Sequence, residues 1–332
     1  MFATVVASMR NEGPFIVEWV TWYRMLGFRR IVVVTNDCTD RSCALLDALE
    51  DARWVQHLRV EVPAGKSITG VKLAAARATR AVSRADWVMV CDADEFLVIH
   101  KGCGKLADLL PEDAPFLGMS INWRVFGTDG HVRFEDGLVH RQFLGAVART
   151  RALSGWLKSI HRHSGWFKAL GEHGPVGLQL DRTKPAWGDE AMVWVDSASR
   201  PLDRWHPDAP YLRVMNAADA THEVAQINHY MLRSAETFGL KAGTLSPVAR
   251  KDRYTEDYWK RANRADQFET SALRYADEFD ALHAAAMALP GVRRLHYLCC
   301  ADHVRLICEK AGREVQDDPR YAEYLAQAAS AG

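Results

Sequence analysis

The sequence lacks an excess of charge of either sign. Its 332 residues include 42 Lys and Arg and 42 Asp and Glu, so its formal net charge is zero. Such a chain has no overall field that draws it to nucleic acid or to an anionic membrane surface, and an anion must bind at a local site. The seven cysteines are unevenly spaced and form no CxxC pair. This excludes the common zinc and redox motifs and favours reduced thiols over a disulfide framework.

Long uncharged apolar runs are also missing. No stretch approaches the ~20 residues that a membrane span needs, and residues 2–8 are typical of a strand rather than of a cationic and apolar leader. We therefore expect a cytoplasmic protein without a transmembrane segment, and peripheral membrane association stays open. With 48% hydrophobic and 25% charged residues, the composition is that of a globular protein able to bury a large core.

The first hundred residues alternate between strand-like and helix-like segments. Strands are predicted at 2–8, 31–35, 54–62 and 87–91, with helices between them at 14–26, 43–50 and 70–83. This rhythm predicts an α/β fold with a doubly wound, mostly parallel sheet.

The remainder of the chain is less regular at first and then helical. Strands are expected near 116–126, 158–162, 191–196 and 224–230, and four helices follow after residue 232. We expect one domain over residues 1–232, with halves at 1–115 and 116–232 and mixed strands in the second half. Residues 233–332 are expected to form a helical C-terminal extension.

Polar residues directly follow three of the predicted strands. The stretch VMVCDADEFLVIH (88–100) brings Asp92, Asp94 and Glu95 to the end of a buried strand, and residues 10–12 and 36–40 follow two others. Ligands of such sheets bind beyond the carboxyl ends of the strands, so these loops are expected to converge. Side chains two apart in an extended chain share a face, which makes the two aspartates candidates for one Mg²⁺ or Mn²⁺ ion. A helix N-terminus or a solvated turn is the alternative.

Six stretches occur in one order: ASMRNEGPFIVEWVTWY, VVVTNDCTDRS, DWVMVCDADEFL, NWRVFGTDG, LKSIHR and INHYMLRSAETFGLK. Through them the chain, over residues 2–265, resembles a family 2 type glycosyltransferase of the GT-A fold, in the bacterial branch with a DADEF motif that is related to family 92 glycosyltransferases. The resemblance implies a metal-dependent inverting hexosyltransferase. Such an enzyme moves a sugar from a nucleotide-sugar to a hydroxyl acceptor, and the expected donor is a UDP-sugar. A glycan acceptor and a role in bacterial surface glycan synthesis are part of this expectation.

The resemblance also implies residue roles in the nucleotide-sugar half, 1–115. Asp37 would read the base, and Asn11 and Glu12 would lie along the nucleoside. Asp94 would bind the metal, and Asp92 would face the ribose or a water on the metal. The alternative for both Asp37 and Asp40 is capping of the following helix, and it is stronger for Asp40 than for Asp37.

Further candidates lie on either side of the metal loop in the sequence. His229 resembles the histidine that completes the metal coordination, with a structural role as the alternative. Lys72 and Lys158 are candidates for the diphosphate, unless they are simply solvated.

Inversion requires one base for the acceptor hydroxyl. The candidates are Glu172, preferred for its Gly-flanked loop beside His173, and then Asp129, Asp189 and Glu190.

The acceptor half, 116–232, is rich in tryptophan, and aromatic faces can stack on sugar rings. Trp123 is favoured for this over Trp166 and Trp187, because it lies in one of the matched stretches. His173 is the second acceptor candidate.

Two other functions stay open. A sugar nucleotidyltransferase carries a glycine-rich phosphate loop, whereas MRNEGP contains one glycine. A non-catalytic nucleotide-sugar-binding module would keep the fold without turnover, and the presence of Asp92, Asp94 and His229 disfavours it.

Overall fold

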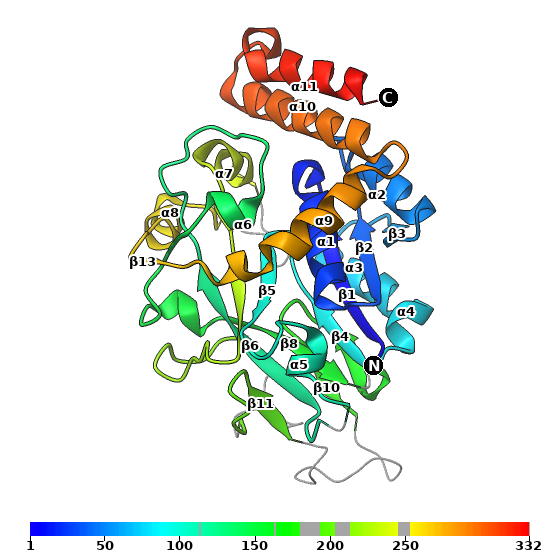
Figure 1. Cartoon of the computed structure of the whole chain (residues 1–332), viewed down its shortest axis with the longest axis vertical. Coiled ribbons are helices and arrows are strands. Elements are labelled where there is room, and N and C mark those ends of the chain that lie inside the picture. Colours follow the sequence, from blue (N-terminus) through cyan, green and yellow to red (C-terminus); the bar gives the residue numbers. More distant parts are fainter. Residues whose placement is uncertain (113, 163, 180–192, 203–212, 245–252, 332) are drawn as a thin grey trace.

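The computed structural model describes residues 1–112, 114–162, 164–179, 193–202, 213–244 and 253–331. Within these residues, nine strands form one central sheet (Figure 1). In spatial order they are β3 (Gln56–Arg59), β2 (Arg30–Thr35), β1 (Ala3–Met9), β4 (Trp87–Val90), β8 (Leu157–Arg162), β6 (Gly118–Val125), β12 (Ala225–His229) and β5 (Glu95–Ile99), and β11 (Trp194–Asp196) pairs with β6.

The pairing directions confirm the predicted α/β class. Strands β3, β2, β1 and β4 are parallel to one another. Strand β8 is antiparallel to β4 and β6, and β5 is antiparallel to β12, while β12 and β11 are parallel to β6. The sheet is thus mostly parallel, and the mixed pairing begins in the second half, as expected.

Both faces of the parallel half are covered by helices. Along β1, Val5 and Ala7 belong to the large core, whereas Val6 belongs to a second core with Leu73 of α3. Helix α1 (Ile16–Leu26) lies on the first face and buries Trp22 completely. It follows a 3₁₀ turn with Pro14 and ends at Gly27, whose φ of 102° lies in the left-handed region that glycine tolerates best.

The remaining elements of the described residues are short helices, two small two-stranded sheets and the C-terminal helices. The helices are α2 (Ser42–Asp51), α3 (Ile68–Arg77), α4 (Arg80–Ser83), α5 (Leu106–Leu109), α6 (Val139–Gln142), α7 (Ala235–Lys241), α8 (Glu256–Ala262), α9 (Ala276–Met287), α10 (Val292–Ala311) and α11 (Pro319–Ser330). Strand β7 (Gly145–Ala146) pairs with β13 (Gln267–Phe268), and β9 (Phe167–Leu170) with β10 (Pro175–Leu178).

Three elements differ from the sequence-based expectation. The helix predicted over 70–83 is two helices, because Thr79 adopts an extended conformation and caps α4 by accepting from the Val82 N–H. Strand β5 is absent from the prediction, although its residues directly follow the acidic loop. Helix α11 is additional to the four helices predicted after residue 232, and it begins with Asp318 as its N-cap and Pro319 in its first turn.

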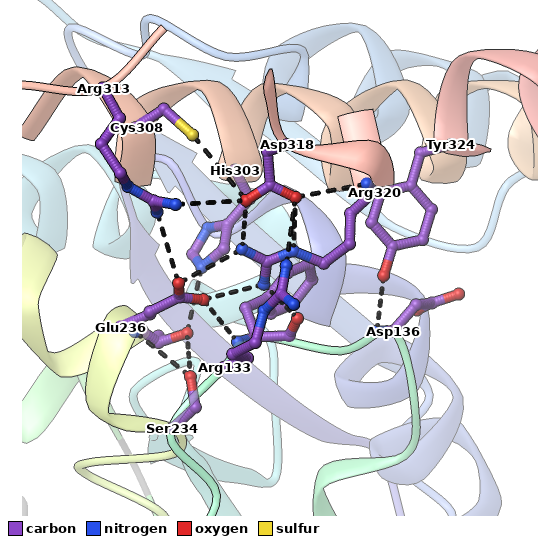
Figure 2. Close-up of polar contacts among 12 residues, drawn as sticks. Arg133, Asp136, Ser234, Glu236, His303, Cys308, Arg313, Asp318, Arg320 and Tyr324 are labelled. Carbon is purple, nitrogen blue, oxygen red and sulfur yellow. Dashed lines mark hydrogen bonds and ion pairs between the residues drawn. The ribbon is translucent and has the colours of Figure 1, made fainter. Parts of the chain in front are cut away.

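The helices after residue 232 are joined to the central sheet and its helices by a shared core and by a buried ion network. Helix α9 packs across α1, and α10 and α11 lie at one end of the molecule (Figure 1). In the network, Arg320 donates to Asp318 at 2.7 Å and to Glu236 of α7 at 2.8 Å (Figure 2). It also donates to the carbonyl of Phe134 at 2.6 Å. Among the described residues, no helix is both long and apolar enough to span a membrane.

Candidate active site

The site lies where the direction of strand order changes. The chain passes from β1 outward to β2 and β3 and then returns to β4 on the other side of β1, and α1 and α3 pack on opposite faces of the sheet, so that this switch point leaves a crevice for ligands. The predicted convergence of the polar loops is present. Arg10 Nε donates to the Asp37 carbonyl at 3.1 Å, and Asn11 Nδ2 donates to Thr39 Oγ1 at 2.8 Å. Trp19 of α1 fixes the loop after β4 by donating to the Asp92 carbonyl at 2.9 Å.

A cavity of about 440 Å³ opens at this point. Its walls come from three stretches of the chain, all before residue 263. They are lined by Ser8, Glu12, Thr69, Asp92, Ala93 and Asp94 from the first half, Trp123, Leu153, Trp156, Glu172, His173, His229 and Met231 from the second, and Lys241, Arg253, Tyr254, Tyr258, Arg261 and Ala262 from the helical region. A cavity of this size with several convergent polar groups is the usual form of a small-ligand site.

The acidic loop is a tight turn rather than an extended segment. The Glu95 N–H donates to the Asp92 carbonyl at 3.1 Å, and the Asp92 N–H donates to Glu95 Oε2 at 2.8 Å. The argument that Asp92 and Asp94 share one face of an extended chain is therefore wrong, because the chain reverses between them. The Asp92 side chain is 44% exposed, that of Asp94 12%, and that of Glu95 not at all.

Each aspartate faces a different lysine. Lys158 of β8 is fully buried, and its Nζ contacts Asp92 Oδ2 at 2.9 Å and Glu95 Oε2 at 3.0 Å. It is not the solvated lysine of the alternative interpretation. Lys241 of α7 contacts Asp94 Oδ2 at 2.8 Å. The two ammonium groups supply the positive charge that clustered carboxylates require.

These contacts set the protonation of the three acids. Burial alone would raise the pKa of Asp92, but the Lys158 ammonium outweighs it and holds that pKa below its usual value. Burial likewise acts against ionisation of Asp94, and Lys241 with His229 brings its pKa well below the ordinary range. For Glu95 burial prevails over Lys158 and raises the pKa to about 7. The two aspartates are thus the ionised groups that face the cavity.

His229 lies beside the acidic turn because β12 pairs with β5, with His229 directly opposite Glu95. Its Nε2 is 3.4 Å from Asp94 Oδ1, and its Nδ1 is 3.9 Å from Glu95 Oε1. Neither Nδ1 nor Glu95 Oε1 has a hydrogen-bond partner in the described part of the chain.

Asp92, Asp94 and His229 offer the carboxylate and imidazole donors that Mn²⁺ accepts, so the donor chemistry fits the predicted metal. The three residues are spaced more widely than the ligands of a formed metal site, because their ligand atoms do not all lie within 4.8 Å of one another. Asp94 and His229 are the pair already in reach. Asp92 is turned toward Lys158 instead.

Of the residues predicted along the nucleoside, Glu12 lines the cavity and Asn11 and Asp37 do not. Glu12 accepts from Arg233 at 2.7 Å, and Arg233 also donates to the Ala93 carbonyl at 2.9 Å. Arg233 therefore ties the loop after β1 to the acidic turn. It was not predicted as a site residue, although it lies in one of the matched stretches.

Asp37 is exposed, has a φ of 46° and accepts from the Asn36 side chain at 2.9 Å. It is not the N-cap of α2, which is Arg41; Asp40, one residue before that cap, accepts from the Ser42 N–H at 3.0 Å. Asp37 lies in the loop after β2, where its carbonyl accepts from Arg10 of the loop after β1.

Lys72 is 2% exposed and donates to the Met9 carbonyl and to Asn36 Oδ1, both at 2.8 Å. It joins the ends of β1 and β2 and does not line the cavity, and burial lowers its pKa to about 8. Lys72 is therefore not a solvated lysine, and it does not line the cavity in which a diphosphate would bind.

The candidates for the base and the acceptor site fall into two groups, those that line the cavity and those that do not. Glu172 and His173 both line the cavity, and burial together with the nearby Asp92 raises the pKa of Glu172. The His173 ring donates from Nδ1 to the Leu157 carbonyl at 2.8 Å, and burial lowers its pKa to about 3, so the ring is neutral at ordinary pH. Trp123 lines the cavity and stacks on Trp156 with 5.5 Å between ring centroids.

Asp129, the second base candidate, lies outside the cavity lining. Its φ is 48°, and its Oδ2 accepts from the Gly145 N–H at 2.7 Å. The carboxylate holds the loop before β7 in place. Trp166 packs in a small separate core with Leu117. Asp189, Glu190 and Trp187 lie outside the described residues.

Sequence reasoning missed the wall that the helical region contributes. Arg253, Tyr254, Tyr258 and Arg261 line the cavity from α8 and the segment before it. Within the part of the chain that the structure describes, neither arginine has an ion pair. Two guanidinium groups without a carboxylate partner favour an anionic ligand. The alternation of basic and aromatic residues in RYTEDYWKR was the available signal.

No family model and no curated protein matches the chain. Several solved structures are similar to it at low identity. The S. aureus TarS 1–349 structure in complex with UDP shares 17% identity over 49% of this chain and 47% of that chain, with a TM-score of 0.33. The chain thus spans about half of that protein in this match.

Two other similar structures contain a bound metal. The mannosyltransferase PcManGT from Pyrobaculum calidifontis, in complex with GDP-Man and Mn²⁺, shares 13% identity over 99% of this chain and 86% of that one, with a TM-score of 0.35. The glucosyl-3-phosphoglycerate synthase from Mycobacterium tuberculosis, in complex with Mn²⁺, UDP and glucosyl-3-phosphoglycerate, shares 15% over 50% and 58%, with a TM-score of 0.27. Since none of these three TM-scores reaches 0.5, the fold class of this chain rests on its own sheet topology.

Proposed function

We propose that the chain is a glycosyltransferase of the GT-A type, which transfers a sugar from a nucleotide-sugar to a hydroxyl acceptor. The observation that carries the proposal is the cavity at the β1–β4 switch point, where the ionised Asp92 and Asp94 face a wall with Arg253 and Arg261. A nucleotide-sugar is a ligand with both a diphosphate and a neutral sugar, and it requires cationic, metal-binding and aromatic groups in one cavity. Those three kinds of group occur together here.

The diphosphate part of the donor would lie between the acidic turn and the two arginines. A divalent cation held by Asp94, His229 and Asp92 would neutralise the charge that builds on the leaving phosphate. Lys241 is a second cation at the same place, because its ammonium lies 2.8 Å from Asp94 Oδ2. The base and ribose would extend toward Asn11, Glu12 and Asp37.

Glu172 is the proposed general base. It lines the cavity next to His173, whose ring centroid lies 5.7 Å from that of Trp123, and its raised pKa keeps it a stronger base than an exposed glutamate once ionised. Its backbone is fixed because its carbonyl accepts from Lys158 at 2.8 Å. In a single displacement, the Glu172 carboxylate takes the proton of the acceptor hydroxyl as the oxygen attacks the anomeric carbon, and the nucleoside diphosphate leaves from the opposite face. The sugar configuration is then inverted.

The finer features of the proposal come from the sequence resemblance. They are a UDP-sugar donor, a glycan acceptor in bacterial surface glycan synthesis, and a domain boundary near residue 232. A nucleotide-sugar donor also agrees with the expected cytoplasmic location.

One structural observation favours a second candidate function. The lysine contacts to Asp92 and Asp94 neutralise the acids without a metal, which would suit a nucleotide-sugar-binding module that lacks turnover. Binding and turnover therefore have to be measured separately.

The test is a panel of UDP-, GDP-, dTDP- and CMP-sugars, each added to the purified chain with MnCl₂ or with EDTA, and followed by melting temperature. At 100 times Kd a ligand adds about 2.7 kcal/mol to the free energy of unfolding, so a tight donor raises the melting temperature clearly. We expect one base class to stabilise the protein, and to do so more strongly with Mn²⁺. If no nucleotide-sugar and no nucleoside diphosphate stabilises the chain in either condition, the proposal is wrong.

A further inference from the structure

A second cluster of metal-ligating side chains lies far from the cavity, between α10 and the segment before α6. Asp136, His296 and Cys300 bring one ligand atom each to within 4.8 Å of the other two. His296 Nε2 is 3.0 Å from Asp136 Oδ1 and 3.8 Å from Cys300 Sγ. In the described residues this is the one group of three or more His, Cys, Asp or Glu side chains with such spacing.

The positions of these residues follow from the fold. His296 and Cys300 are four residues apart on α10, so they lie one turn apart on the same face of the helix. Asp136 is held against that face because its backbone N–H donates to the hydroxyl of Tyr324 on α11 at 2.9 Å (Figure 2). The sequence distance of 160 residues between Asp136 and His296 explains why no motif revealed the cluster.

The distances agree with those around a tetrahedral metal ion. With bonds of about 2.0 Å to nitrogen or oxygen and about 2.3 Å to sulfur, donors around Zn²⁺ lie roughly 3.3 to 3.6 Å apart. The two measured separations, 3.0 and 3.8 Å, bracket this range. A single imidazole nitrogen has one lone pair or one hydrogen, so it cannot serve both neighbours fully through direct hydrogen bonds.

Burial and access also suit a bound ion. The Cys300 side chain is fully buried and that of His296 is 7% exposed, whereas the Asp136 side chain is 28% exposed. Asp136 lines a second cavity of about 430 Å³, together with Arg133, Tyr297 and Glu323. An ion could enter from this cavity, and a water molecule from it could take the fourth position. Burial raises the pKa of the Cys300 thiol, and a bound cation would deprotonate it.

We propose that Asp136, His296 and Cys300 form a site for a zinc-class divalent metal, separate from the cavity at the acidic turn. The sulfur donor selects Zn²⁺ or Co²⁺ over Mg²⁺ and Ca²⁺. The ion would clamp the segment before α6 to α10, and so fix the C-terminal helices on the sheet domain. On binding, the thiol proton is released to solvent, and no other bond is broken. The site needs no nucleotide-sugar and does not depend on the proposed transferase activity.

The test uses the full chain, stripped with EDTA and titrated with Co²⁺. We expect one equivalent to bind with a near-ultraviolet thiolate-to-cobalt band and visible bands of tetrahedral intensity, and Zn²⁺ to abolish both. Cys300→Ser should remove the thiolate band. Cys299→Ser is the matched control, because Cys299 is the adjacent, equally buried cysteine outside the cluster.

Asp136→Asn is a second variant that keeps the test valid if Cys300→Ser does not fold. The Asp136 side chain is partly exposed, so this substitution should leave the fold intact. It should lower Zn²⁺ affinity, measured against a chromogenic chelator, by more than the ~10–100-fold that outer-shell changes cause. Absence of a thiolate band in the wild-type chain, or its persistence in Cys300→Ser, would show that the three groups are only hydrogen-bonded to one another and would overturn the site.

Discussion

Glu172 is the residue on which the chemistry of the proposal depends. Glu172→Gln keeps the size of the side chain and removes the base, so it should lower transfer by ~10²-fold or more while donor binding stays intact. Glu256→Gln, at a side chain that is 78% exposed at the start of α8, is the control and should retain full activity. Initial rates and titration of the donor are the two measurements. Full activity of Glu172→Gln would leave the base among the acids at 189 and 190.

The pH profile gives an independent reading of Glu172. Its pKa is raised above the usual 4.5, first by burial and then by Asp92. The base acts when ionised, so the rate should fall as the pH drops through this raised pKa, and the acidic limb should lie above pH 4.5. In Glu172→Gln the limb should be lost. An unchanged limb in that variant would assign it to a different group.

Asp94 is the residue that tests the metal. Asp94→Asn removes the charge that Lys241 and His229 both face, so Mn²⁺ should no longer strengthen the binding of a nucleoside diphosphate. The measurement is calorimetric titration with and without Mn²⁺. Asp51→Asn, on the exposed side of α2, is the control. Metal-dependent affinity that is equal in Asp94→Asn and wild type would exclude Asp94 as a metal ligand.

Among the elements, the attachment of α11 to α7 offers the sharpest stability test. Arg320 is 10% exposed at its side chain, and it contacts Asp318, which is 1% exposed, and Glu236, which is 17% exposed. Arg320→Met would leave two carboxylates without a buried partner, and we expect a loss of ~3–5 kcal/mol in the free energy of unfolding. Arg313→Met removes a guanidinium that reaches the same two acids but is 48% exposed, so it should cost less than ~1 kcal/mol. Urea unfolding measures the free energy of unfolding of both variants. Equal losses of this free energy in the two variants would contradict the predicted difference.

The same network predicts how stability depends on acid. Hydrogen bonds from Arg320 lower the pKa of Asp318 to about 2. In the unfolded chain the pKa of the Asp318 carboxyl group is near 3.8. The stabilisation by the Arg320–Asp318 pair is therefore fully present above that pH. It is lost as the pH falls through the folded value near 2. Arg320→Met should therefore lose less stability than the wild type between pH 4 and pH 2, as acid-dependent urea midpoints would show.

The elements of the parallel half could be predicted because their sequence patterns are local. Strands β1, β2, β3 and β4 and helices α1 and α2 agree with the patterns of residues 2–91, and the polar loops after three strands marked the site. The pairing of β5 with β12 could not be foreseen, since it joins residues more than a hundred positions apart. For the same reason Lys241, Arg233 and Arg253 were not recognised as neighbours of the acidic turn.

For some residues, the contacts predicted from the sequence differ from those in the structure. Lys72 and Lys158 look alike in the sequence, yet one ties two strand ends together and the other neutralises Asp92 and Glu95. Asp129 was the base candidate after Glu172 in the sequence, but its carboxylate accepts from backbone N–H groups of the loop before β7. Residue type alone cannot distinguish these cases, because the partner decides the role.

At the scale of the whole molecule, the central claim is that the cavity at the sheet switch point transfers a sugar with inversion. Proton NMR of the most stabilising nucleotide-sugar, incubated with the chain and a panel of simple glycoside acceptors, tests it most directly. The account predicts that the donor is consumed, that nucleoside diphosphate appears, and that the anomeric proton of the new product has the configuration opposite to that of the donor. A product of retained configuration would contradict the single displacement at Glu172, and a donor that binds but is never consumed would show that the chain is a binding module.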